Sequence, residues 1–173
     1  MGTLYQYFPN KSSLLQALLK EHLDGVAAAV ESACASAEGT SLAGMAEEIV
    51  SAFVRAKFRN LDASVVLYAV SDDVEGKRIA QGMHARVIAA MKGLFESAQD
   101  ATIGEPGVVA ATLLSAMAGV SRGMLEGGVT RVTMASMERE LTLLVRAYLE
   151  ASAVPFVTAV SYTHLTLPTN REV

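Results

Sequence analysis

Residues 2–15 read GTLYQYFPNKSSLL, and their pattern predicts a short helix, a break and a second helix that opens on two serines. The break falls at Pro9. Leu4 and Phe8 are four residues apart, so their apolar side chains share one face of the short helix and point to the same core. The chain is therefore predicted to begin with two consecutive helices, the first of which needs a packing partner.

The polar side chains of the short helix point away from that core. They include the hydroxyl groups of Thr3, Tyr5 and Tyr7, which can bond phosphate oxygens or a base edge of DNA. Lys11 lies near the start of the next helix, where its ammonium group and the exposed backbone amides could hold one phosphate. These four residues are the candidate DNA contacts, and the alternative is that the tyrosines merely pack.

This segment resembles the recognition helix and following linker of TetR-type transcriptional repressors. Members of that family bind DNA through a helix-turn-helix and sense small molecules in a helical C-terminal domain. The resemblance implies an all-α fold, in which a helix-turn-helix DNA-binding domain precedes a helical ligand-binding and dimerisation domain. It assigns the four polar residues to DNA contact, and Leu4 and Phe8 to the structure of the helix.

The resemblance also indicates what precedes Gly2 in the family, namely two helices and a tight turn that hold the recognition helix in the major groove. We expect this chain to contain only a remnant of that domain. The family often has valine where this chain has Met1, and a GTG codon read as a start gives methionine. We therefore expect the natural gene product to bind DNA, and this polypeptide not to do so specifically.

We expect three regions: a DNA-binding remnant over 1–23, a ligand-binding and dimerisation domain over 24–156, and a non-native tail over 157–173. The tail is rich in β-branched residues and does not continue the helical periodicity before it. Its run 160–169 resembles the conceptual translation of a transposase-based sequencing adapter, so it is excluded from the fold prediction. A natural disordered tail is the alternative.

Composition favours helix along the rest of the chain, because Ala, Leu, Met, Glu and Arg fill long stretches and strand patterns are weak. We predict a helix from Ser12 to a turn at 38–40. Further helices are predicted over 41–60, 64–70, 75–97, 108–126 and 133–150. Ser41 is expected to cap the second helix, and Thr133 or Ser136 the last. Residues 100–107 form the clearest loop.

Charge and hydropathy exclude several classes. A net charge of −4 argues against most of the surface binding nucleic acid, so any DNA contact is local. No uninterrupted span of ~20 apolar residues occurs, and the start of the chain lacks a secretory signal, so we expect no membrane association and a cytoplasmic location. The single cysteine, Cys34, is expected to be a small buried apolar residue.

The helices over 108–126 and 133–150 correspond by order to the family's dimerisation pair, and we expect a homodimer through them. The first of these helices is apolar on nearly all sides, so other protein must cover it. The effector pocket is expected between 41–60, 75–97 and 108–126, by analogy and because helical cores host ligand sites. The candidate ligand-binding residues are Met45, Phe53, Tyr68, Met83, Met91, Met117 and Arg122.

Arg122 is the most specific of these candidates, because a charge on an apolar helix needs either an acidic partner or an anionic effector. Methionines are more often ordinary core residues, and His84 is expected to be a surface or satisfied residue. No catalytic constellation, metal-spaced ligand set or phosphate loop occurs, so we predict neither an enzyme nor a cofactor or metal site.

The sequence thus predicts a ligand-responsive transcriptional regulator, a repressor released by a small-molecule effector, whose partners are an operator DNA, the effector and a second copy of the chain. The alternative is a dimeric helical ligand-binding module without DNA-binding activity.

Overall fold

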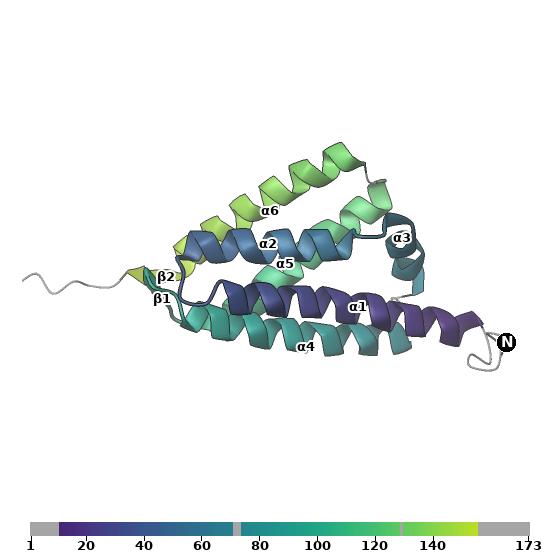
Figure 1. Cartoon of the computed structure of the whole chain (residues 1–173), viewed down its shortest axis with the longest axis horizontal. Helices are drawn as coiled ribbons and strands as arrows, with labels where there is room; N and C mark the ends of the chain where they lie inside the picture. The colour runs from purple at the N-terminus through teal and green to yellow at the C-terminus, as the bar shows by residue number, and fades with distance from the viewer. Residues whose placement is uncertain (1–10, 71–73, 129, 156–173) are drawn as a thin grey trace, which may run out of the picture.

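The computed structural model describes residues 11–70, 74–128 and 130–155, which form a helical body closed at one end by two short strands (Figure 1). The predicted DNA contacts Thr3, Tyr5 and Tyr7 lie outside the described residues, as does the predicted tail over 157–173. An all-α fold is therefore confirmed for the described part of the chain.

Helix α1 (Lys11–Ser36) buries a stripe that includes Leu19, Leu23, Val26 and Val30, as the spacing of these residues predicts. The stripe packs against both α4 and α2. After α1 the chain turns at Gly39, where the backbone angle φ is +70°, in the left-handed region that favours glycine. The predicted turn over 38–40 is thus present.

Helix α2 (Leu42–Lys57) begins at its predicted cap: the Ser41 hydroxyl oxygen accepts a hydrogen bond from Gly44 N at 3.2 Å. A second acceptor comes from a distant part of the chain, since Asp100 Oδ1 accepts from Leu42 N at 3.0 Å. A carboxylate here also complements the positive end of the helix dipole.

Helix α2 ends before the predicted position 60, because Asn60 caps the next helix instead. Its Oδ1 accepts from Ala63 N at 3.1 Å. Helix α3 (Leu61–Val70) consequently starts earlier than predicted, and it is followed by α4 (Val74–Glu96), which lies beside α1 (Figure 1).

Arg86 of α4 ties the two neighbouring helices together. Its guanidinium donates to Glu31 of α1 at 2.9 and 2.7 Å and to Asp24 of α1 at 3.1 Å. The three side chains are partly exposed, so these ion pairs contribute little to stability and mainly fix how α4 lies on α1.

Helices α5 (Pro106–Gly127) and α6 (Arg131–Ser152) form the C-terminal pair, in which α5 packs mainly against α4 and α6 against α2 (Figure 1). α6 begins earlier than predicted. Thr130, rather than Thr133 or Ser136, is its cap, and Thr133 completes a capping box: each threonine hydroxyl bonds the other's backbone N–H.

Helix α5 is long and apolar enough to cross a membrane, but a core helix of a folded domain meets the same criteria. One face, including Leu113, Leu114 and Met117, is completely covered. Val108 and Val120, in contrast, are exposed at 58% and 39% in the single chain. The rest of the chain thus covers only part of the apolar surface of α5.

The predicted loop over 100–107 contains a strand that the sequence pattern did not indicate. β1 (Ala101–Ile103) pairs antiparallel with β2 (Ala153–Pro155), so that Thr102 faces Val154. Three residues are too few to show a strand periodicity, which explains why the pair could not be predicted.

The core runs through all the long helices and includes Phe53, Phe95, Met45 and Met91 among its largest fully buried side chains. Cys34 is buried in it, as predicted. Burial raises the pKa of the Cys34 thiol to about 11, and the nearby Glu31 carboxylate adds to this effect, so the thiol is un-ionised at neutral pH.

Candidate ligand-binding site

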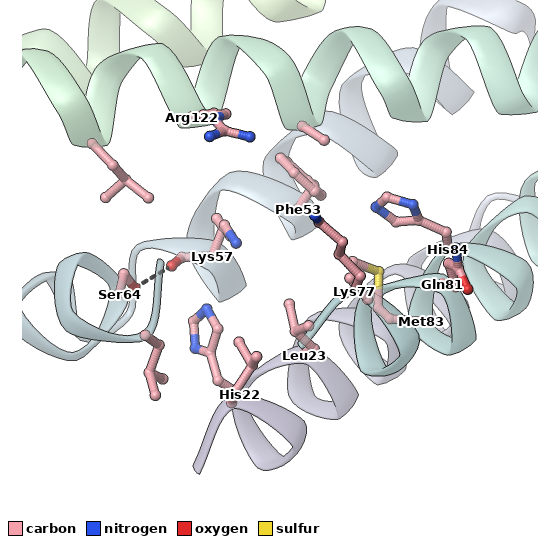
Figure 2. Close-up of a pocket in the computed structure, with 15 residues that line it drawn as sticks. His22, Leu23, Phe53, Lys57, Ser64, Lys77, Gln81, Met83, His84 and Arg122 are labelled. Atoms are coloured by element: carbon pink, nitrogen blue, oxygen red, sulfur yellow. Dashed lines mark hydrogen bonds between the residues drawn. The ribbon is translucent and has the colours of Figure 1, made fainter. Parts of the chain in front are cut away.

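A cavity of about 350 Å³ opens between α1, α2, α3, α4 and α5 (Figure 2). This volume is at the lower end of the range of about 300–1,000 Å³ typical of small-molecule pockets. Its walls combine apolar side chains with nitrogen-bearing ones. The lining residues are Leu19, His22, Leu23, Phe53, Lys57, Ser64, Leu67, Lys77, Ala80, Gln81, Met83, His84, Ala118, Arg122 and Leu125.

The apolar wall consists mainly of core side chains that present one edge to the cavity. Phe53 and Met83 are almost fully buried, and Leu23 and Leu67 extend the same surface. Such a wall can bind the hydrocarbon part of a ligand, because that part leaves water on binding.

Basic side chains from four helices also line the cavity, and Figure 2 shows them turned toward the same space. They are His22 of α1, Lys57 of α2, Lys77 and His84 of α4, and Arg122 of α5. No aspartate or glutamate is among the described residues that line the cavity. Three of the five are lysine or arginine side chains, whose ordinary form is cationic.

Two of the lysines have no carboxylate partner within the described ranges: neither Lys57 nor Lys77 forms an ion pair there. Lys57 is half-buried, and burial lowers the pKa of its ammonium group. Arg122 differs, because its Nε lies 3.3 Å from Glu126 Oε1, one turn along α5. Arg122 is also half-exposed, so it is less embedded than the apolar helix around it suggested.

His22 is a buried polar group with an unused bonding site. Its Nε2 atom is covered and has no hydrogen-bond partner among the described residues. Burial, followed by the charges of Lys57 and Arg59, lowers the pKa of His22 to about 4, so the ring is neutral at pH 7. Burial, followed by Lys57, lowers the pKa of His84 in the same direction.

Only some of the predicted ligand residues meet at this cavity. Phe53, Met83 and Arg122 line it. Met45, Met91 and Met117 do not; each is completely buried, which is the ordinary core role of methionine.

Tyr68 belongs to α3, and its side chain lies outside the described part of the structure. Lys11 is the described member of the predicted DNA contacts: it is exposed at the first position of α1.

Sequence reasoning missed His22, Lys57 and Lys77, and it expected His84 to be a surface or satisfied residue. These residues are far apart in sequence, and each is ordinary on its own helix. The available signal was Lys57, which follows the core residue Phe53 by four positions and so lies near the same face of α2.

A second hollow, of about 420 Å³, lies between α5 and α6 and is mostly apolar. Val120, Met124 and Leu144 contribute to it. This hollow therefore lies between the two helices that the sequence predicted to form the dimer interface.

Within its described ranges the chain is a six-helix body with a partly basic cavity and a C-terminal helix pair. The model of the tetracycline repressor-like C-terminal domain family matches residues 41–149. The chain therefore belongs to the tetracycline repressor-like family, whose members are regulators. No curated protein and no solved structure matches the chain.

Proposed function

We propose that this protein is a ligand-responsive transcriptional regulator in the cytoplasm, a repressor that a small-molecule effector releases from operator DNA. The observation that carries the proposal is the position of α1. This helix starts at Lys11, directly after the predicted recognition segment, and two turns later it lines the cavity through Leu19, His22 and Leu23.

A ligand in the cavity contacts α1 and at the same time the walls formed by α2 to α5. A ligand that fits one position of α1 better than another shifts the population between the two positions. Because α1 continues from the predicted DNA-contacting residues, such a shift reorients them. Ligand binding and DNA binding are then coupled and, by linkage, reciprocal.

Dimerisation belongs to the same proposal. The pair α5 and α6 carries exposed apolar side chains next to its hollow, among them Val120 and Leu144. Packing against a symmetry-related pair covers them and sets the spacing of two DNA half-sites.

The test is a selection of bound duplexes from random DNA, followed by anisotropy titrations at several salt concentrations. It uses two proteins: residues 1–173, and the same chain extended by any residues encoded in frame before Met1. A near-palindromic site bound in a salt-dependent manner by the longer protein is the expected result. Absence of a preferred sequence in both proteins would favour a ligand-binding module without DNA-binding activity.

Substitutions then separate the two kinds of contact in that longer protein. Tyr7→Phe and Lys11→Ala are expected to weaken binding to all sequences, because they remove phosphate contacts. Thr3→Ala is expected to change base preference instead. A Lys11→Ala variant that binds as tightly as the parent would contradict the assignment of that residue.

A further inference from the structure

We propose that the cavity between α1 and α5 selects small anionic molecules with an apolar body, and that Lys57 is the principal contact of the anionic group. This inference rests on the proposed ligand-binding function and specifies the chemical class of the effector.

The balance of charge in the cavity is the first observation. Lys57, Lys77 and Arg122 bring positive charge to the cavity from three helices, and no acidic side chain lines it within the described ranges, although Arg122 pairs with Glu126 beside it. A charge removed from water is unfavourable unless an opposite charge or hydrogen bonds compensate it. For the half-buried Lys57, the described part of the chain provides no such carboxylate.

The arrangement of the nitrogen atoms is the second observation. Figure 2 shows Lys57 reaching into the space that separates His22 from Arg122. Its charge also lowers the pKa of both histidines of the cavity, His22 and His84. An anion beside Lys57 therefore lies within the field of several basic groups at once.

The unused Nε2 atom of His22 is the third observation. Protein covers this atom in the structure, so it meets an oxygen of the ligand only when the ring turns toward the cavity, where the Nε2–H form of the neutral imidazole donates a hydrogen bond. A bond from a neutral donor to an anionic acceptor is stronger than one between two neutral groups.

The apolar wall fixes the remainder of the ligand. Phe53, Met83 and Leu67 offer hydrocarbon surface in the same cavity as the basic groups. A compound with a single anionic end and an apolar body contacts both kinds of side chain, whereas a cation meets repulsion and a neutral alcohol leaves Lys57 uncompensated.

The experiment compares four probes that each contain a linear chain of ten carbon atoms, namely decanoate, decyl phosphate, decanol and decyltrimethylammonium, below the concentrations at which they form micelles. Binding is measured by isothermal titration calorimetry and by the thermal shift of the protein. We expect both anions to bind, decanol to bind at least about tenfold more weakly, and the cation not to bind. The two anions distinguish a carboxylate site from a phosphate site.

Lys57→Gln keeps a polar side chain, shorter by one atom, and removes its charge. It is expected to weaken decanoate binding about tenfold and to leave decanol binding unchanged. Lys77→Gln, at a more exposed position, provides a second variant in case Lys57→Gln does not fold. The matched control is Lys92→Gln on α4, which lies outside the cavity and pairs with Glu96 at 3.7 Å.

Equal binding of decanol and decanoate, or preferential binding of the cation, would overturn the anion inference while leaving a ligand-binding function intact. Failure of all four probes to bind would also overturn it. Neither outcome affects the DNA selection described above, so the failure of one proposal is distinguishable from the failure of the other. An unchanged decanoate affinity in both Lys57→Gln and Lys77→Gln would refute the assigned contacts.

Discussion

At the scale of single residues, His22 is a partly buried histidine whose environment disfavours its charged form. Its ring sits between a buried apolar stripe and two positive charges, and its pKa of about 4 lies below the usual 6.5. Protonation is therefore less favourable in the folded protein than in the unfolded chain. The stability associated with a neutral His22 is fully present above pH 6.5 and is lost as the pH falls toward 4.

We predict that His22→Gln reduces the loss of stability between pH 7 and pH 4.5. The expected reduction is on the order of 1 kcal/mol, after allowing for solvent screening of a partly buried ring. Urea unfolding at several pH values measures it. A variant whose stability falls as steeply as that of the parent protein would show that His22 does not titrate as described.

The residue scale also shows where prediction from sequence stops. Phe53 and Met83 could be selected because large side chains on apolar faces commonly line pockets. Met45 and Met117 were selected by the same rule, yet they are fully buried. The rule identifies the buried face of a helix, and whether that face meets another helix or a cavity depends on tertiary packing.

At the scale of elements, the helices could be predicted and their connections only in part. Ser41 and the turn at Gly39 are local signals, and the structure has both. The carboxylate of Asp100 at the start of α2 is a contact across 58 positions of the chain, and no local pattern indicates it. The same holds for the β1–β2 pair.

We predict that Asp100→Ala destabilises the protein by about 1 kcal/mol, because the substitution removes an acceptor at the N-terminus of α2. Glu105→Ala is the matched control: Glu105 precedes α5 but its side chain makes no capping hydrogen bond. The control is expected to change stability by less than about 0.5 kcal/mol. Equal effects of the two substitutions in thermal unfolding would contradict the capping role.

At the scale of the whole molecule, α5 and α6 leave apolar surface that the single chain does not cover. Leu144 is 41% exposed and lies at the hollow between these helices. This surface is consistent with the proposed homodimer, and it lies on the face of the molecule that the helix order of the family predicts.

We predict that Leu144→Glu raises the dimer dissociation constant about a hundredfold, because a carboxylate in a packed interface loses its hydration. Val65→Glu on α3 is the control, since Val65 is similarly exposed, at 46%, on another helix. Sedimentation velocity over a range of concentrations gives both constants. If Val65→Glu dissociates the dimer and Leu144→Glu does not, the interface lies elsewhere.

The small β1–β2 pair has a consequence for how motions of the helical pair can be followed. Strands of three residues do not persist alone in water, so their pairing depends on the helices that hold them in register. β1 directly precedes α5, and β2 directly follows α6. The backbone amides of the pair should therefore exchange with deuterium whenever either helix undocks. Their exchange rates then measure how often such openings occur, with and without a ligand.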